Sequence, residues 1–493
     1  MDEASPGMLC WAIMILAYDI GTTFLKAAVV SIDGKVLSSA RIPVRMVEGN
    51  DPARRECDAN TWLSGIAMVT AQLRLREHGR IRGVVVSANG PTLVPVGSEG
   101  EPLDFAMTWM DRRAQEEADI VAEFSDTPLD ASFYLPKAFW IMRHKPDIYE
   151  RTRHFLPCAE YVSFFLTGNA VRIVPTQVFK DFFWNEGAIP RLKMDQEKFP
   201  PLVEIGELIG TVRAEAEETL GVPAGLPVIA GGPDYVMSII GSASTQPGRV
   251  CDRAGTSEGI NLCWSAPVKD RRLLCFPHVV RGAYNVSAII SSSGSALDWA
   301  VRTFGNGDGG IEALLKEAAS VPPGAGRLLF LPFLTPERFP IWDPHMRGAF
   351  LGLTLSHGRK EMMRAVLESS GFAVRSVIAA MEDTDCQIAD LRVTGGLARI
   401  PLWCQARADV TGKKVLLPEQ EESDLVGNAC VGFFGLEEFD SPANAAEHLV
   451  RFQKVFMPNE AARGAYDELF QLFTKACTEL GETFRGLAPG SEG

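Results

Sequence analysis

The chain has no surplus of positive charge and no hydrophobic run long enough to cross a membrane. Its 48 Lys and Arg residues are outnumbered by 62 Asp and Glu residues, which gives a net charge of -14. Nucleic acids and anionic membranes both select a basic surface, so we expect neither as a partner. The apolar run 8–17 follows acidic residues and is too short for a bilayer span, and it therefore predicts a buried strand.

The ten cysteines form no C-x-x-C pair and no metal-finger spacing. Scattered cysteines of this kind are typical of a reducing compartment, whereas disulfide frameworks belong to small secreted domains. We expect reduced cysteines that fill buried positions, and a cytoplasmic location. Low-complexity sequence is also absent before the short Gly/Pro/Ser tail at 488–493, so the whole chain is expected to fold.

What the chain does have is length and apolar content. With 493 residues and 46% apolar residues it exceeds the usual size of a single hydrophobic core. Between 221 and 250 the composition shifts to Pro, Gly and small residues, which indicates a domain junction. We therefore expect two domains, 1–245 and 246–493.

The order of predicted elements favours an α/β fold. Residues 12–40 read as a three-stranded antiparallel meander, with a Gly-Thr-Thr break and an Asp-Gly turn between the extended runs. A helical pattern at 61–75 and a continuous apolar, β-branched run at 81–88 follow. Residues 250–264 repeat the opening order of strand, Gly-Thr-Ser break and strand, which indicates an internal duplication. The last third is mainly helical, at 359–383 and 462–484.

The first candidate motif is the turn at Gly21, Thr22 and Thr23, with Asp19 before it and Lys26 after it. Glycine permits close backbone approach, N–H groups and hydroxyls can hold phosphate oxygens, and a carboxylate can hold Mg²⁺. The same pattern also joins ordinary hairpins. By itself the motif leaves both interpretations open.

The second motif is the matching turn at Gly255, Thr256 and Ser257. Two facing turns from duplicated halves would bind a polyphosphate from both sides without a large basic patch. Arg253 lies near the position that corresponds to Asp19, so only the first half carries the candidate metal carboxylate.

The third and fourth motifs each lie between a strand and a helix. Asp234 follows Gly231-Gly232-Pro233, where a carboxylate at a strand end can reach a substrate hydroxyl. Asp is also a favoured helix N-cap, which is the simpler interpretation of the residue alone. Gly395 and Gly396 would let a flat base lie against the backbone near a helix N-terminus, although a lone Gly-Gly turn is common.

Taken together and in this order, the four motifs resemble those of the FGGY carbohydrate kinases, from about residue 16 to about residue 480. Five further stretches match this family: 101–114, 135–149, 338–357, 394–412 and 422–435. In the last of these, the usual Gly-Ala-Ala is Gly427-Asn428-Ala429.

The resemblance implies two duplicated actin-like (ribonuclease H-like) ATPase domains with an interdomain cleft, and ATP-dependent phosphorylation of a small sugar or polyol with Mg²⁺. It implies that Asp234 is the base and that Asp19 lies near Mg²⁺. The implied phosphate-binding residues are Gly21, Thr22, Thr23, Lys26, Gly255 and Thr256, and the implied adenosine-binding residues are Gly395, Gly396, Leu397 and Ile400. These roles suit phosphoryl transfer, which requires alignment, charge neutralisation and a base.

The sugar-binding loop departs from the family pattern. Xylulokinases look closest, yet their Ser-Gly-Gln-Met-His-Gly loop corresponds here to residues 87–92, without the Gln, Met or His. Proline cannot replace the hydrogen bonds of histidine, so the pocket presents a different polar pattern. A ketopentose such as xylulose or a related sugar is the expected substrate class. The candidate sugar contacts are Asn89, Gly90, Pro91, Trp109, Asp111 and Tyr235, with Trp109 equally interpretable as a core aromatic.

Two alternatives stay open at this point. An inactive, nucleotide-dependent sugar sensor or scaffold would keep the fold, but it has no reason to retain both Asp19 and Asp234. A chaperone-type ATPase would release ADP without sugar. The partners we expect are ATP and a small sugar or polyol, and a homodimer stays an open alternative. The acidic stretch 420–424 is interpreted as a solvated loop.

Overall fold

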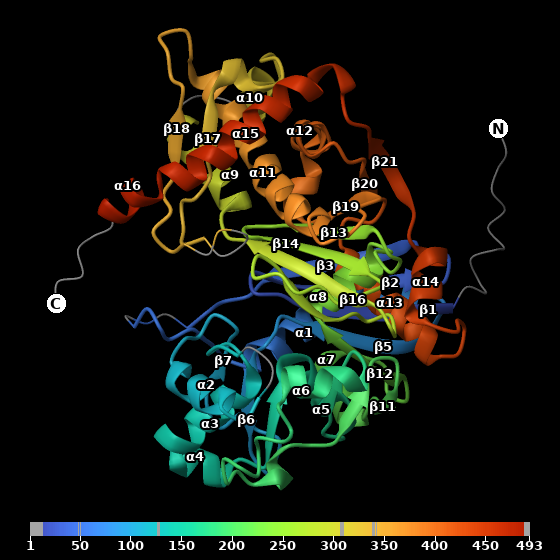
Figure 1. Cartoon of the computed structure of the whole chain (residues 1–493). Helices are drawn as coiled ribbons and strands as arrows, with labels where there is room; N and C mark the ends of the chain where they lie inside the picture. The colour runs from blue at the N-terminus through green and yellow to red at the C-terminus, as the bar shows by residue number, and fades with distance from the viewer. Residues whose placement is uncertain are drawn as a thin grey trace, which may run out of the picture. The chain divides into compact units, whose positions relative to one another are not determined.

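The computed structural model describes residues 13–47, 49, 51–125, 129–305, 310–337, 341 and 343–487. The N-terminal extension 1–12 lies outside the described residues, as do Pro340 and Trp342 of the segment 338–357 that matches the family pattern. The chain forms two compact units, drawn in Figure 1. Unit 1 comprises 1–243 and 423–450, and unit 2 comprises 244–422 and 451–493.

Unit 1 is built on a six-stranded sheet of order β11-β12-β5-β1-β2-β3. The meander predicted for 12–40 is present as β1 (Ile13–Ile20), β2 (Phe24–Ser31) and β3 (Val36–Pro43), which pair antiparallel. β5 (Arg80–Ala88) and β12 (Pro227–Pro233) lie parallel to β1. Strands buried on both faces read as continuous apolar runs, and β1 and most of β5 fit this rule.

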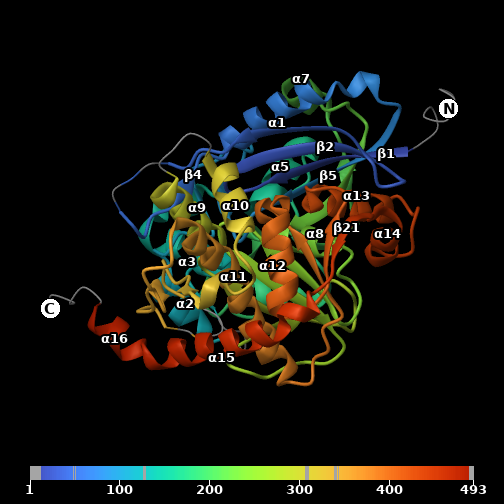
Figure 2. The ribbon, with the colours of Figure 1, turned by 90° about the horizontal axis from the view of Figure 1, so that it is seen from above.

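Helices from distant parts of the sequence cover this sheet. Figures 1 and 2 draw α13 (Ser423–Gly435) beside β1, although about 400 residues separate the two in sequence. α13 packs against α8 (Asp234–Gly241), where two glycines allow close contact. A Cβ on Gly427 would lie 2.0 Å from the Met237 carbonyl oxygen, and one on Gly241 would lie 1.8 Å from that of Ser423. Residues 423–450 thus belong to unit 1, which a single division of the chain at 245 does not anticipate.

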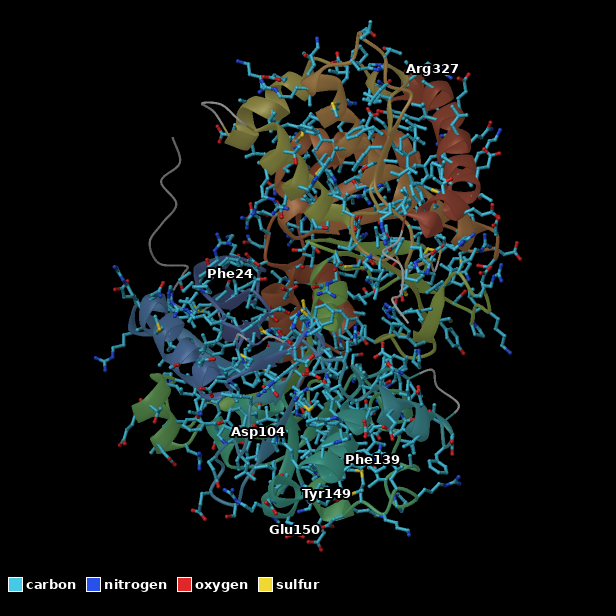
Figure 3. All side chains as sticks on the ribbon, turned by 90° about the vertical axis from the view of Figure 1, so that its left-hand side faces the viewer. Phe24, Asp104, Phe139, Tyr149, Glu150 and Arg327 are labelled. Carbon is cyan, nitrogen blue, oxygen red and sulfur yellow. The ribbon has the colours of Figure 1, made fainter. Side chains whose placement is uncertain are left out.

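A second layer of unit 1 carries a four-stranded sheet of order β4-β7-β6-β8. Figure 3 labels Asp104 and the α4 residues Tyr149 and Glu150 in this part of the unit. The strands of this sheet are β4 (Glu56–Cys57), β6 (Leu93–Val96), β7 (Ala106–Met107) and β8 (His154–Pro157). The remaining elements of unit 1 are α1 (Asn60–Leu73), α2 (Gln115–Ala122), α3 (Tyr134–His144), α4 (Pro146–Arg151), α5 (Cys158–Thr167), β9 (Arg172–Val174), α6 (Lys180–Phe183), β10 (Leu202–Glu204), β11 (Leu208–Thr211), α7 (Ala214–Leu220) and α14 (Pro442–Leu449).

Unit 2 repeats the same topology in a seven-stranded sheet of order β15-β16-β14-β13-β19-β20-β21. β13 (Arg249–Ala254), β14 (Glu258–Trp264) and β16 (Tyr284–Ile290) pair antiparallel, as β1, β2 and β3 do. β19 (Asp390–Thr394) and β20 (Val415–Pro418) run parallel to β13, as β5 and β12 run parallel to β1. The internal duplication inferred from the repeated turn is therefore confirmed by strand order and direction.

The core of unit 2 lies between this sheet and its helices, of which α11 (Arg359–Glu382) is the longest. Two-thirds of the α11 residues are buried, more than a helix with a single apolar face would bury. The remaining elements of unit 2 are β15 (Leu274–Pro277), α9 (Ser293–Phe304), α10 (Gly310–Ala319), β17 (Leu329–Leu331), β18 (Ala349–Leu351), α12 (Pro401–Thr411), β21 (Phe452–Phe456), α15 (Arg463–Glu479) and α16 (Gly481–Gly486).

Two expectations from composition can be compared with the described residues. None of the nine cysteines among them forms a disulfide bond, and seven are buried. No helix in the described part of the chain is both long enough and apolar enough to span a bilayer.

Candidate active site

The first predicted phosphate-binding turn joins β1 and β2 in unit 1. The Gly21 N–H donates to the Phe24 carbonyl at 2.9 Å, and a Cβ on Gly21 would lie 2.8 Å from that oxygen. Glycine is therefore required for the tight turn. Thr22 is half-buried and Thr23 is exposed, while Figure 3 labels Phe24 at the start of β2.

Asp19 lies just before this turn and is 1% exposed. The Ser87 hydroxyl donates to Asp19 Oδ1 at 2.7 Å. Lys26 lies opposite Asp19 in the β1–β2 ladder, and its Nζ is 3.8 Å from Asp19 Oδ2. Burial raises the pKa of Asp19 well above its ordinary value, and the negative charges of Asp424 and Asp234 add to the effect, which Lys26 opposes. A cation beside Asp19 would favour its ionised form.

Asp424 was missed by the sequence reasoning, which placed it in a solvated loop. That interpretation is wrong for this residue: Lys26 Nζ lies 3.1 Å from Asp424 Oδ2, and the Ser238 hydroxyl donates to Asp424 Oδ1. Nearby on the same helix, Asn428 Nδ2 donates to the Tyr18 carbonyl and to Ser87 Oγ, both at 2.8 Å. The only sequence signal for these residues was the match of 422–435 to a family pattern.

Asp234 lies at the carboxyl end of β12, two strands away from Asp19. Gly232 pairs with Ser87 of β5, which pairs with Asp19 of β1, so the ends of three parallel strands meet at one edge of the unit 1 sheet. Gly231 makes this possible, because a Cβ there would lie 2.0 Å from the Val86 carbonyl oxygen. The charge of Asp234 raises the pKa of Asp19.

The helix-cap interpretation of Asp234 differs from the observed geometry. Asp234 is the first residue of α8, and the N-cap position is held by Pro233, which forms no side-chain cap hydrogen bond. A carboxylate in the first helical turn is still favoured by the helix dipole. The Asp234 side chain is half-buried, as is that of its neighbour Tyr235.

The loop 89–92 follows β5 at the same edge of the sheet. The Asn89 backbone N–H and its Nδ2 both donate to the Ile20 carbonyl at 2.8 Å, and Asn89 Oδ1 accepts from Thr92 Oγ1 at 2.7 Å. Gly90 and Pro91, joined by a cis peptide bond, are half-buried. Lys137 Nζ, which is fully buried, donates to the Pro91 carbonyl at 2.6 Å. The sequence placed Lys137 in a matching helix but gave it no role.

Trp109 and Asp111 differ in accessibility. Trp109 is half-buried, and its Nε1 donates to Thr22 Oγ1 at 3.0 Å, which joins the candidate sugar contact to the phosphate-binding turn. Asp111 is fully buried and accepts hydrogen bonds from the Arg55 N–H at 2.9 Å and from Arg113 Nη2 at 2.8 Å. In this structure the Asp111 carboxylate is engaged by Arg55 and Arg113.

The second turn, in unit 2, joins β13 to β14. The backbone N–H groups of Gly294 and Ser295, in the first turn of α9, donate to the carbonyls of Gly255 and Thr256, each at 3.1 Å. Thr256 is exposed, as Thr23 is in unit 1. The start of α9 therefore holds the turn while the threonine side chain faces solvent.

The Gly395–Gly396 turn lies beside the Gly255 turn within unit 2. Gly395 has φ +88°, and a Cβ there would lie 2.6 Å from the Ala254 carbonyl oxygen. Gly396 is exposed and Ile400 is half-buried, but Leu397 is 7% exposed and packs in the core. A cavity of about 300 Å³ adjoins them, and its lining includes Thr394, Ala398, Arg399, Pro401, Leu417 and Pro418.

A buried ionic cluster lies under the second turn. Arg407 Nη1 is 2.7 Å from Glu258 Oε1 and 3.1 Å from Asp252 Oδ2, and all three side chains are fully buried. Burial and the Glu258 charge raise the pKa of Asp252 well above its ordinary value. Burial opposes ionisation of Glu258 too, but Arg407 and hydrogen bonds hold its pKa below the ordinary value. The two carboxyl groups therefore differ in pKa, and the Arg407 guanidinium favours the ionised form of Glu258.

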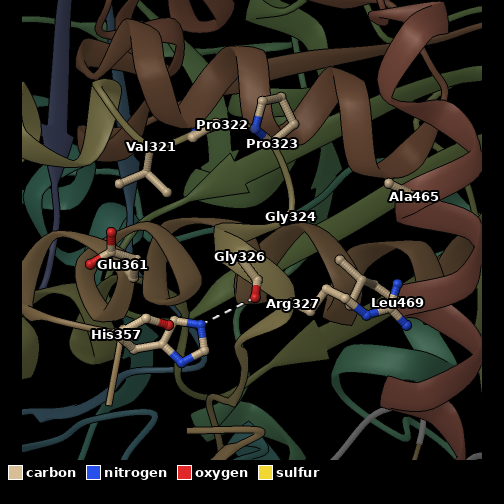
Figure 4. A pocket seen from close by; sticks show the side chains of 11 residues that line it. Val321, Pro322, Pro323, Gly324, Gly326, Arg327, His357, Glu361, Ala465 and Leu469 are labelled. Carbon is tan, nitrogen blue, oxygen red and sulfur yellow. Dashed lines mark hydrogen bonds between the residues drawn. The ribbon is translucent and has the colours of Figure 1, made fainter. Parts of the chain in front are cut away.

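Another cavity of unit 2, of about 330 Å³, holds none of the predicted site residues. Figure 4 shows it, with His357 Nε2 bonded to the Gly326 carbonyl oxygen at 3.1 Å. Its charged side chains already have partners: Arg327 Nη1 lies 2.9 Å from Glu468, and Glu361 accepts from the Gly358 N–H at 2.9 Å. We assign it no role.

Comparison with protein families decides the relationship. The N-terminal domain model of the FGGY family of carbohydrate kinases matches residues 14–241, and the C-terminal domain model of that family matches 253–436. The chain belongs to the FGGY family of carbohydrate kinases. It is accordingly a phosphotransferase, and the predicted family, fold and enzyme class are confirmed.

Individual relatives include two kinds of kinase. The xylulose kinase of Staphylococcus epidermidis is 26% identical over 477 residues, covering 93% of this chain and 95% of that protein. The gluconokinase of Bacillus licheniformis is 25% identical over 503 residues, covering 96% of this chain and 97% of that protein. The crystal structure of xylulose kinase from Rhodospirillum rubrum matches with a TM-score of 0.83 and 26% identity, covering 96% of this chain and 100% of that one.

The residues of unit 1 fit a magnesium–nucleotide complex. In the described part of the chain no group of three or more His, Cys, Asp or Glu side chains could hold a metal ion. Mg²⁺ bound with a nucleotide usually takes only one or two protein carboxylates, and water and phosphate oxygens complete its shell. A single buried carboxylate with neighbouring negative charges, as at Asp19, suits that arrangement.

Proposed function

We propose that this carbohydrate kinase transfers the γ-phosphoryl group of ATP to a hydroxyl of a small sugar or polyol, with Asp234 as the base. The observation that carries the proposal is the edge of the unit 1 sheet. There the ends of β1, β5 and β12 bring together Asp19, the 89–92 loop and Asp234. In open α/β sheets, ligands bind outside the carboxyl ends of the strands.

In this proposal Asp234 accepts the proton of the sugar hydroxyl while the hydroxyl oxygen forms a bond to the γ-phosphorus. The bond from that phosphorus to the bridging oxygen breaks, and ADP carries the electron pair away. Gly21, Thr22 and Thr23 in unit 1, and Gly255 and Thr256 in unit 2, bind phosphate oxygens. Gly395, Gly396 and Ile400 border the adenosine.

Asp19 would hold Mg²⁺, which neutralises developing charge on the phosphates when it is bound. Lys26 supplies a second positive charge near the transferred group. Leu397 packs in the core of unit 2, so its contribution to adenosine binding is through the backbone of the turn.

The acceptor belongs to the polyhydroxylated sugars of the relatives, a ketopentose such as xylulose or a sugar acid such as gluconate. Asn89, Trp109 and Tyr235 are the proposed contacts, since all three are half-buried and lie on unit 1 near the proposed base or turn. Gly90 and Pro91 shape the loop. Asp111 acts indirectly, through Arg55 and Arg113.

An assay of ADP release across xylulose, other ketopentoses, pentitols, gluconate and glycerol tests the proposal. Asp234→Asn should lower kcat with the best sugar by about 10²- to 10⁴-fold, the range for loss of a general base. Asp181→Asn, which changes an exposed carboxylate of α6 in the same unit, is the control. Full sugar-dependent turnover in Asp234→Asn would refute the role of the base.

The alternative is a sugar sensor that binds nucleotide without turnover. It predicts no ADP release with any sugar, while calorimetry still detects binding of both ligands. ADP release that no sugar stimulates would indicate an ATPase instead.

A further inference from the structure

We propose that Asp424 is a positioning residue that holds the Lys26 ammonium away from Asp19. The inference rests on the proposed function, because it concerns the side chains around the phosphate-binding turn of unit 1. None of the family motifs in the chain assigns a role to this residue.

The distances define the arrangement. Lys26 Nζ lies 3.1 Å from Asp424 Oδ2 and 3.8 Å from Asp19 Oδ2. Asp19 and Lys26 are direct neighbours across the β1–β2 ladder, where side chains of opposite charge attract each other. Without a competing carboxylate, Lys26 would pair closely with Asp19. Asp424 provides that competitor and leaves Asp19 available to a cation.

The site is only partly open to water, which makes these charges effective. The side chains of Lys26, Asp424 and Asp19 are 20%, 16% and 2% exposed. Screening is weaker there than at a fully exposed pair. The lysine stem has four rotatable bonds, so an ammonium without a fixed partner would sample many positions.

The side chain of Asp424 is held in place by a neighbouring helix. Its Oδ1 accepts a hydrogen bond from the Ser238 hydroxyl on α8. α8 and α13 approach closely at Gly241 and Gly427, where a side chain would overlap the backbone of the other helix. The carboxylate is thus held on a packed helix pair.

The proposed consequence is that Asp19 and Lys26 have separate roles. Asp19 stays free to hold the metal, and Lys26 stays directed to the transferred phosphoryl group. Because Asp424 contacts neither ligand in this scheme, its loss should affect kcat and leave both KM values nearly unchanged.

The experiment is a double-mutant cycle on the full chain with the sugar that supports the fastest ADP release. Asp424→Asn should lower kcat by about 10- to 100-fold, as loss of a supporting partner usually does. In a Lys26→Met background the same substitution should have almost no further effect, because the two residues act as one unit. Asp424→Glu, which keeps the charge, should restore part of the activity.

Controls and contrary outcomes separate the possibilities. Glu438→Gln changes an exposed carboxylate just after α13 and should leave kcat and the melting temperature unchanged. If Asp424→Asn lowers kcat equally in both backgrounds, or lowers the melting temperature without a change in kcat, the proposal is wrong.

A readout without turnover covers the case in which no sugar is phosphorylated. Crystal structures of the unchanged protein and of Asp424→Asn should show that Lys26 Nζ moves towards Asp19 in the variant. An unchanged Lys26 position would overturn the inference even if the kinase proposal holds, whereas a moved Lys26 would support it even if the kinase proposal fails.

Discussion

The two glycine–threonine turns, one in each unit, have the same backbone plan and different electrostatics. Each joins the first two strands of a sheet of equivalent topology. Beside the first turn, Lys26 and Asp424 remain partly open to water, while Asp19 is buried. Beneath the second, the fully buried Arg407 pairs with both Asp252 and Glu258, which are fully buried too.

This difference shows how a duplicated fold can divide its tasks. In our proposal the charges of unit 1 bind a cation, because Lys26 Nζ stays 3.8 Å from Asp19 Oδ2. The charged side chains of unit 2 pair with one another and stabilise the turn. Four substitutions test the comparison, from the largest expected effect to the smallest.

Arg407→Met should lower the free energy of unfolding by about 3–5 kcal/mol, because removing one partner leaves buried carboxylates without compensation. Urea unfolding followed by tryptophan fluorescence measures it, since the Arg407 guanidinium stacks on Trp403 at 4.3 Å. Arg359→Met, which removes an exposed ion pair with Glu317, should cost less than about 1 kcal/mol. Equal losses in the two variants would contradict the assigned difference in burial.

Asp19→Asn should lower kcat by about 10²- to 10³-fold, because the variant loses the carboxylate that we propose for Mg²⁺ and with it part of the charge stabilisation. Substituting Arg253, at the corresponding position of unit 2, by Asn should have a much smaller effect on kcat. Steady-state kinetics at saturating Mg²⁺ compare the two. A similar loss at both positions would mean that the two turns share the same role.

Lys137→Met should remove a pH dependence of stability. Burial lowers the pKa of Lys137 from an ordinary value of 10.5 to about 7 in the folded chain. Between these values the unfolded chain binds more protons, so the unchanged protein should gain stability as pH rises from about 7 to 10.5. Urea unfolding at several pH values should show this rise in the unchanged protein.

The rise in the unchanged protein is compared with the rise in Lys137→Met. Their difference gives the contribution of Lys137 alone, apart from other groups that titrate in the same pH range. Lys145→Met, at the residue after α3, should keep the rise. Persistence of the full rise in Lys137→Met would assign it to other groups.

Asn428→Ala, which restores the family's usual alanine, should cost about 1 kcal/mol, the net value of a typical hydrogen bond. Its amide donates to the Tyr18 carbonyl and to Ser87 Oγ, and the loss is partly offset because its Oδ1 is buried without a partner in the described structure. Thermal unfolding detects the change, with the exposed Asn444→Ala as control. An unchanged melting temperature would mean that the hydrogen bonds of the Asn428 side-chain amide make no net contribution to stability.

Much of the fold was predictable from local pattern. The meander 12–40 and the strand 81–88 have continuous apolar runs separated by turn residues, and both were found where expected. The repeated Gly-Thr turn predicted the duplication correctly, because a turn that joins equivalent strands keeps its glycine.

Residues whose role depends on a distant partner were not predictable in the same way. Asp424 belongs to an acidic stretch that resembles any solvated loop until Lys26 and Ser238 are seen beside it. Asp111 has the polarity of a sugar contact, yet its carboxylate is buried against Arg55 and Arg113. Lys26 and Ser238 are far from Asp424 in sequence, and Arg55 is 56 residues from Asp111, so these contacts leave no periodic signal.

The sequence by itself determined the family, the duplicated α/β topology and the residue types beside each turn. Strand period, glycine positions and motif order are local properties, so they can be read along the chain. The tertiary structure alone decided that α13 joins unit 1 and that Asp424 competes with Asp19 for Lys26. Such charge balances depend on distance and burial, which arise only when segments about 400 residues apart are packed together.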